Sequence, residues 1–249
     1  MTFGHLAGEL VRRVSGKDLM EYLHDNILDP LEVSDFFIGL PDSVTDSDGK
    51  LVPFDQSRVA DLVDGDGAID AGTPGLFNRP EVRRAVIPSA NGEPPRYRSR
   101  LGCILLKATA RSLLAGHTNG RALARIYSAV ANPPNSMISP QHIDLMRSTH
   151  SPPHSADDDV SVGQGMRFGL GFRLSAPDEE MDYWFGPNMG SFGHTGAGGA
   201  SVGFADPETN LSFGYTASRF DQSASYDGSE RRKHIIRAVY KVIEEIWED

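Results

Sequence analysis

Apolar residues recur at helical spacing through the first part of the chain and alternate with polar residues through the second. The helical period predicts helices that bury one face, and the alternation predicts half-buried strands. The predicted helices cover residues 3–14 and 80–86 and the stretches that follow Asp18, Asn119, Ser139 and Ser229. The predicted strands cover residues 168–174, 200–205 and 211–217.

The order of these elements indicates an α+β protein. We expect a helical lobe, and beside it an antiparallel sheet with the C-terminal helix packed on it. Residues 206–210 supply the Asp, Pro and Asn of a turn between two strands, so the last strands form a hairpin. The apolar stripe of the first helix is expected to be core; its members are Leu6, Leu10, Val11 and Val14. All 249 residues are expected to form one domain.

Composition limits the function classes. The net charge is −10, which argues against nucleic acid or an anionic membrane as the main partner, since both need a basic face. There is no run of about 18 apolar residues and no signal peptide, so we expect no membrane span and, by default, a cytoplasmic location. The single cysteine, Cys103, excludes an internal disulfide framework and a multi-cysteine zinc site.

Clusters of potential metal ligands occur only in turn-rich segments. Their spacing does not match the EF-hand loop, and a histidine pair without a further ligand is weak evidence for zinc, so no metal or cofactor is expected. The residues considered are Asp42, Asp46, Asp48, Asp61, Asp64, Asp66, Asp70, His150 and His154.

The stretch from Ser191 to Phe204 carries the most chemical information, because a His-Thr-Gly step is followed by a run of small residues. Three interpretations are open. A phosphate loop is disfavoured, since the glycine spacing is not G-x-G-x-x-G and no helix follows. A purely structural tight turn is the second. The third is a substrate-facing strand of a serine acyl-transfer enzyme, whose K-T-G signature differs from His194-Thr195-Gly196 in its first residue.

Several segments together resemble the serine β-lactamase-related family, which includes class C β-lactamases, related carboxylesterases and eukaryotic β-lactamase-like proteins. The resemblance covers nearly the whole chain except about residues 93–116. It implies a β-lactamase/transpeptidase-like fold and a serine hydrolase mechanism. The segments that carry it are residues 3–17, 27–41, 120–132, 168–172 and 192–207.

The chain departs from the family where the catalytic motifs should be. The family's nucleophile lies in S-x-x-K at the start of a buried helix, whereas Ser47-Asp48-Gly49-Lys50 lies in an acidic turn and is interpreted as a chance match. The family's tyrosine motif would precede Thr2. We therefore expect an incomplete, C-terminal part of a family member, in which the nucleophilic serine, the lysine and the tyrosine are absent.

Only the third motif carries over from the resemblance. His194 occupies the place of the K-T-G lysine and could hydrogen-bond a substrate carboxylate or a leaving group. Thr195 offers a hydroxyl, and Gly196 leaves room for the substrate. Ala197 matches the position whose backbone N–H completes the oxyanion hole. The implied substrate is a small ester, amide or β-lactam-like molecule; the alternative is a non-catalytic pseudo-enzyme that binds a ligand or a partner protein.

Residues 93–116 differ in composition from their surroundings. They contain four arginines and Cys103, and no acidic residue follows Glu93. Without them, residues 87–92 would join residues 117–125 in a segment similar to the family's. We interpret 93–116 as an insertion that arose from a translated intron or a gene-model artefact. A genuine surface insertion is the alternative, because exposed loops tolerate insertions.

Transcript sequencing tests this interpretation. We expect the spliced message to lack the codons for residues 93–116, because the flanking codons then encode one continuous family-like segment. Reverse transcription and sequencing across codons 87–125 measure it. A spliced message that retains these codons would contradict the artefact and support the surface insertion.

Overall fold

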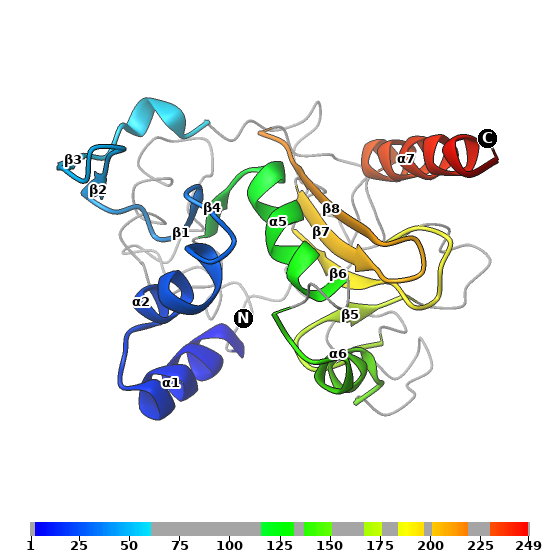
Figure 1. The fold of residues 1–249 in the computed structure, drawn as a ribbon, viewed down its shortest axis with the longest axis horizontal. Helices are drawn as coiled ribbons and strands as arrows, with labels where there is room; N and C mark the ends of the chain where they lie inside the picture. The colour runs from blue at the N-terminus through cyan, green and yellow to red at the C-terminus, as the bar shows by residue number, and fades with distance from the viewer. Residues whose placement is uncertain are drawn as a thin grey trace, which may run out of the picture.

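The computed structural model describes residues 3–60, 116–131, 137–150, 167–175, 184–196, 201–218 and 230–248 (Figure 1). The helices are α1 Phe3–Ser15, α2 Leu19–Leu23, the π-helical turn η1 His24–Leu28, the 3₁₀ turn η2 Gln56–Arg58, α5 Gly120–Ala131, α6 Pro140–Arg147 and α7 Glu230–Glu248. The strands are β1 Phe36–Ile38, β2 Ser43–Thr45, β3 Leu51–Pro53, β4 Gly116–Thr118, β5 Arg173–Leu174, β6 Phe192–Thr195, β7 Ser201–Asp206 and β8 Leu211–Thr216.

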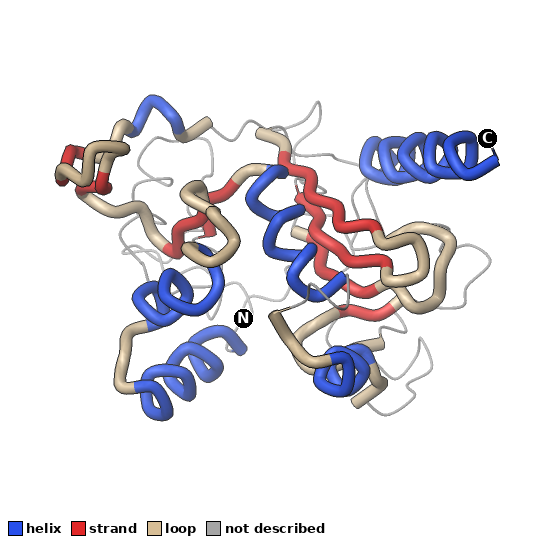
Figure 2. Tube along the Cα trace, viewed as in Figure 1, coloured by secondary structure: helices blue, strands red, loops and turns tan. Residues whose placement is uncertain are grey.

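An antiparallel four-stranded sheet in the order β5-β6-β7-β8 forms the centre of the second part of the chain (Figure 2). Side chains alternate between its two faces. On one face, Phe192 and Ala205 pack with Val130 of α5. On the other face, Val202 and Phe204 pack with Ile236 of α7. The predicted α+β class and the packing of the C-terminal helix on the sheet are therefore confirmed.

The helical lobe contacts the sheet domain through α5. Leu28 and Val33 of the lobe pack against Ala122 of α5 in a buried apolar cluster. The short strands β1 and β4 pair next to this cluster, with Phe36 opposite Thr118. One helix thus serves two cores, and its position fixes the lobe relative to the sheet.

Helix α1 ends as the sequence predicts but exposes the stripe that was expected to be core. Gly16 follows the helix with a φ of +75°, the left-handed conformation of a glycine C-cap. Leu6, Leu10 and Val14 are 67%, 63% and 80% exposed, so the prediction that they are buried is wrong. The face of α1 that packs is the one with Gly8, which lies against Leu19 of α2.

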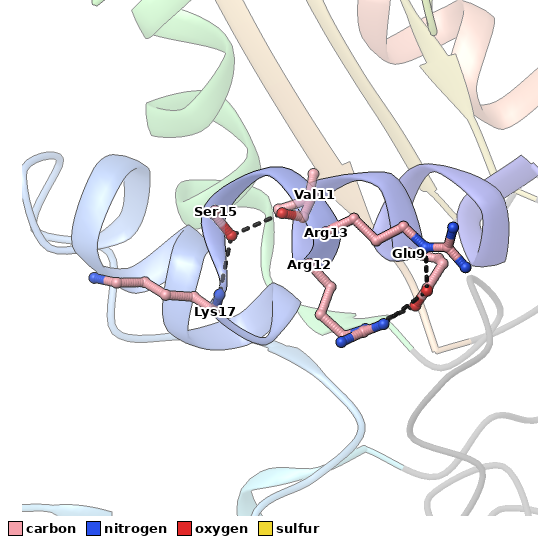
Figure 3. Close-up of polar contacts among 6 residues, drawn as sticks. All are labelled: Glu9, Val11, Arg12, Arg13, Ser15 and Lys17. Atoms are coloured by element: carbon pink, nitrogen blue, oxygen red, sulfur yellow. Dashed lines mark hydrogen bonds and ion pairs between the residues drawn. The ribbon is translucent and has the colours of Figure 1, made fainter.

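The polar face of α1 is held by local contacts (Figure 3). The Glu9 carboxylate accepts hydrogen bonds from Arg12 and from Arg13, at 2.8 and 2.7 Å from their Nε atoms. The bond from Arg12, followed by the one from Arg13, lowers the pKa of Glu9 to about 2. The Ser15 hydroxyl donates to the Val11 carbonyl at 2.7 Å near the C-terminus of the helix.

Other predicted boundaries change for local reasons. The helix that follows Asp18 is split, because the amide of Asp29 bonds to the His24 carbonyl and widens the last turn. The predicted strand over residues 168–174 is reduced to Arg173 and Leu174, since Gly171 has a φ of +82° and makes a turn. The hairpin predicted around residues 206–210 is confirmed as β7 and β8.

Several predictions fall outside the described residues. These are the helix 80–86, the cap Ser229, the acids at 61–70, Cys103, His154, Ala197 and residues 93–115 of the proposed insertion. Its last residue, Gly116, begins β4. Within the part of the chain that is described, no helix is long and apolar enough to span a membrane.

A buried carboxylate joins the β7–β8 hairpin to α7. Asp206 is fully buried and accepts hydrogen bonds from Tyr240 Oη at 2.5 Å, Asn188 Nδ2 at 2.7 Å and Thr209 Oγ1 at 2.8 Å. A buried carboxylate is tolerated only when donors surround it. Burial, then the bond to Asp206, raises the pKa of Tyr240, so its hydroxyl keeps the proton that it donates.

The substitution Tyr240→Phe tests this junction. It removes one donor from the buried carboxylate, and we expect the free energy of unfolding to fall by about 2 kcal/mol. Urea denaturation followed by circular dichroism measures the change. The control is Tyr215→Phe on β8, for which no hydrogen bond is seen among the described residues. Equal losses in the two variants would mean that the Asp206 contact adds nothing specific.

Candidate active site

The His-Thr-Gly step lies at the open end of strand β6. Strand β5 pairs with β6 only through Arg173 opposite Gly193 and Leu174 opposite Phe192. On the other side, β7 accompanies β6 along its whole length, with His194 opposite Gly203. In the described part of the chain, the edge of β6 from His194 to Gly196 therefore has one neighbouring strand and one open side.

The backbone alternation assigns the groups that face the open side. The Ser175 amide donates to the Ser191 carbonyl at 3.2 Å, and the Gly196 amide donates to the Ser201 carbonyl at 2.8 Å. Odd-numbered residues of β6 thus bond toward β5, and even-numbered ones toward β7. We infer that the backbone of Thr195 faces the open side, where an extended or carbonyl-bearing ligand can meet its N–H.

The ring of His194 is oriented by its neighbour. Nδ1 of His194 lies 2.9 Å from the Thr195 carbonyl oxygen. Because a carbonyl oxygen only accepts, Nδ1 carries the proton in this contact. In the neutral ring, Nε2 then holds a lone pair. The side chain is exposed, so this lone pair belongs to a group that a ligand can reach.

The protein favours the neutral form of this ring. The pKa of His194 is lowered, first because the ring is partly withdrawn from water and also because the positive charge of Arg173 opposes protonation; the bond to Thr195 acts in the other direction. At neutral pH the residue is therefore an uncharged acceptor at Nε2. A lysine in this place would be a cation with donors only.

Arg173, which pairs with Gly193 of β6, is buried and stacks on the ring of Trp184. Its guanidinium centre lies 3.2 Å from the centroid of the Trp184 ring, and that of Arg232 lies 5.4 Å from the same ring. Arg173 and Trp184 are only 4% and 5% exposed. The stack fixes a positive charge close to the candidate site, within reach of His194 electrostatically but shielded from solvent.

Gly196 lies in close contact with Ser201 of the neighbouring strand. A Cβ at this position would overlap the hydroxyl of Ser201 across the strand pair. The glycine therefore leaves space that Ser201 fills from inside the sheet, in addition to the room for substrate that the sequence indicates. Ser201 lies in the stretch from Ser191 to Phe204 but was not itself a candidate site residue.

Tyr127 is the other residue that the sequence did not single out. It lies in the helix that the sequence predicts after Asn119. In the structure its ring lies over Gly203, the register partner of His194, and meets Phe172 edge to face at a centroid distance of 6.1 Å. A helical period shows only that a position is apolar; it cannot show that a glycine on a distant strand makes room for the ring.

The structure does not bring the remaining candidate residues into this site, or does not describe them. Ser47-Asp48-Gly49-Lys50 forms an exposed turn between β2 and β3, where Asp46 Oδ1 accepts the amide of Lys50 at 2.8 Å. This agrees with the interpretation as a chance match to S-x-x-K. Ala197 lies outside the described residues. Among the residues that are described, no three of His, Cys, Asp and Glu gather as metal ligands.

A helical lobe beside an antiparallel sheet, with His-Thr-Gly at the end of strand β6, is the arrangement of the β-lactamase/transpeptidase-like class. The Beta-lactamase family model matches residues 1–236, and the chain belongs to this family.

Relatives support this assignment. A curated relative from Mycobacterium tuberculosis (strain ATCC 25618 / H37Rv), esterase/beta-lactamase LipL, is 28% identical over 222 residues, which are 88% of this chain and 47% of the relative. The crystal structure of a family VIII carboxylesterase matches with a TM-score of 0.67 and 28% identity, over 96% of this chain and 56% of that one. A penicillin-binding protein homologue from Caulobacter crescentus matches with a TM-score of 0.66 and 26% identity, over 96% and 57%. The chain thus spans about half the length of the relatives that it matches.

Titration of His194 tests the electrostatics of the site. We expect a midpoint below the ordinary value of 6.5, because the folded protein disfavours the imidazolium. The unfolded chain then binds more protons, so this residue's contribution to stability is lost as the pH falls from 6.5 through the folded-state midpoint. NMR of the ring Cε1–H measures the midpoint, and His194→Gln assigns the signal. A midpoint at or above 6.5 would contradict the prediction.

Proposed function

We propose that this chain is the C-terminal portion of a serine hydrolase that cleaves ester or amide bonds, β-lactams included, through an acyl-enzyme. The observation that carries the proposal is the end of β6 at His194–Gly196, which among the described residues has no neighbouring strand on the β5 side. Family membership supports it, and the similar proteins are named as an esterase/beta-lactamase, a carboxylesterase and a penicillin-binding protein homologue. In this proposal the chain supplies the strand along which the substrate lies.

His194, Thr195 and Ala197 each have a proposed role. The Thr195 N–H, facing the open side, hydrogen-bonds the substrate backbone or carbonyl, and the Thr195 hydroxyl binds a neighbouring polar group. Ala197 supplies one N–H of the oxyanion hole, a contribution that typically changes the rate by about 10²–10³. His194 presents Nε2 as an acceptor to an N–H or O–H group of the substrate.

Among these substrates we propose a preference for uncharged esters over carboxylate-bearing β-lactams. The support is the state of His194. Its Nδ1 proton is engaged by the Thr195 carbonyl at 2.9 Å, and its pKa is lowered. A neutral ring with its lone pair outward does not attract a carboxylate, whereas the lysine of K-T-G does.

We further propose that this chain alone lacks the nucleophile. The four residues Ser47–Lys50, which match S-x-x-K, form an exposed turn. The nucleophilic serine of the family lies instead at the start of a buried helix, where it is activated. An oxyanion donor without a nucleophile gives no covalent catalysis. Residues 93–116 are proposed to be an insertion that interrupts a continuous family-like segment.

A burst assay tests the activity of the chain. p-Nitrophenyl butyrate and the chromogenic cephalosporin nitrocefin are incubated with the purified chain at enzyme concentrations high enough to see one turnover. We expect no stoichiometric burst with either, and the same background rate for the chain and for its His194→Ala variant. A burst of acylation by the chain would refute the proposed absence of the nucleophile.

The alternative is a non-catalytic protein that binds ligand at the same edge. The exposed ring of His194 and the outward Thr195 amide favour it as much as they favour catalysis. The same NMR signals separate the two: saturable shifts of His194 and Thr195 with an intact, uncleaved ester indicate a binding protein. An in-frame S-x-x-K and tyrosine motif in the genomic sequence before the Met1 codon would instead support the truncated hydrolase.

A further inference from the structure

The hydroxyl of Ser201 occupies the space above Gly196. A Cβ built on Gly196 would overlap Ser201 Oγ, so the hydroxyl takes the position that a side chain at residue 196 would have. The Gly196 amide also donates to the Ser201 carbonyl at 2.8 Å, which holds the two residues opposite each other at the ends of β6 and β7. The sequence predicts empty space for a substrate at this glycine, whereas the structure places an oxygen atom there.

This hydroxyl lies on the same face of the sheet as the His194 side chain. Phe192 of β6 and Ala205 of β7 both pack with α5, so they mark the α5 face. Side chains two residues apart share a face, and His194 and Gly196 are therefore on this face of β6. By the same alternation, Ser201 is on this face of β7. Positions 194 and 196 are about 7 Å apart along the strand, so a ligand at the His194 ring has the Ser201 hydroxyl beside it.

Within the described part of the chain, the Ser201 hydroxyl has no hydrogen-bond partner, and the residue is only half-buried. Its register partner, Thr216, brings a second hydroxyl to the same face. Farther along β7, this face carries Gly203 and Ala205, which lie under α5. The face therefore changes from a packed surface under the helix to a hydroxyl-bearing surface at the end beside His194.

The two side chains present complementary groups to a ligand. His194 accepts at Nε2, since its Nδ1 proton is engaged by the Thr195 carbonyl at 2.9 Å. The hydroxyl of Ser201 can donate, and an ester carbonyl oxygen can only accept. A ligand that uses both groups therefore needs an N–H or O–H for His194 and, a few bonds away, a carbonyl oxygen for Ser201. An uncharged ester with a hydroxyl close to its carbonyl has both.

We propose that Ser201 is a ligand-binding residue of the candidate active site: its hydroxyl, seated over Gly196, donates to the carbonyl oxygen of a hydroxy ester whose own hydroxyl donates to His194 Nε2. The inference rests on the proposed function and narrows its substrate class to hydroxy esters. It also adds a side chain from β7 to a site that otherwise uses β6.

Two matched esters test the two contacts separately. The probe is ethyl 3-hydroxybutyrate, and ethyl butyrate is the same ester without the hydroxyl. NMR titration, followed at the Thr195 amide, measures the Kd of each. Ser201→Ala should raise the Kd of both esters about fivefold, which is the loss of one ordinary hydrogen bond. His194→Ala should raise the Kd of the hydroxy ester alone, because ethyl butyrate has no donor for Nε2.

The matched control is Ser212→Ala. Ser212 is the register partner of Ala205, so it lies on the same face but at the other end of β8. This variant should bind both esters as the parent chain does. If Ser201→Ala fails to fold, two variants of similar shape replace it. Ser201→Thr keeps the hydroxyl and should bind as the parent does, whereas Ser201→Cys has a weak donor and should bind both esters less tightly.

The outcomes separate this inference from the proposed function. If the parent chain binds the esters and Ser201→Ala or Ser201→Cys binds them equally well, the role of Ser201 is overturned and the proposed function stands. An equal loss of affinity in Ser212→Ala would overturn that role as well. If neither ester gives saturable shifts in the parent chain, both the proposed function and this inference are contradicted.

Discussion

The close approach of α5 to the sheet is the constraint on which the rest of the structure depends. A Cβ at Gly214 would overlap the carbonyl oxygen of Gly120, and a Cβ at Gly203 would overlap the ring of Tyr127. Two glycines of the sheet therefore let the helix settle directly on β7 and β8. With the helix at this depth, Val130 and Ala131 complete the core with Phe192 of β6. The strand that carries the candidate site is thereby packed from below by the same helix.

The same helix holds the lobe. Asn119 caps α5, accepting the amide of Ala122 at 2.9 Å, while its Nδ2 donates to Asp35 of the lobe at 2.9 Å. Farther along, Arg125 donates to the carbonyl of Glu32 at 2.8 Å. A change in the seating of α5 on the sheet must therefore move the lobe as well. Because both the lobe and β6 pack on α5, the helix sets their relative position.

The sequence predicted correctly those elements that depend on residues close together in the chain. The β7–β8 hairpin followed from alternation and from turn residues at 206–210, and α7 from a long apolar period. The predictions failed where contacts with residues distant in the sequence determine which side chains are buried. The stripe at Leu6, Leu10 and Val14 has the period of a buried face, yet period alone does not say which face finds a partner, and Gly8 is the residue that packs. Likewise, a sequence motif indicated His194, Thr195 and Gly196 as candidates. Tyr127 lies near them only because Gly203, on strand β7, leaves space for its ring.

The chemistry of the candidate site on β6 follows from this packing more than from the identity of one residue. Replacing the K-T-G lysine by histidine does not by itself remove the charge, because imidazole in water is protonated below about pH 6.5. Two features of the fold favour the neutral ring: partial withdrawal from water and the buried positive charge of Arg173 on its Trp184 stack. The hydrogen bond from Nδ1 to the Thr195 carbonyl acts in the other direction on the pKa and fixes the position of the Nδ1 proton. The fold thus converts a position that is a cationic donor in the K-T-G motif into a neutral acceptor. The substrate preference that we propose for this position therefore depends on the packing around β6 and not on His194 alone.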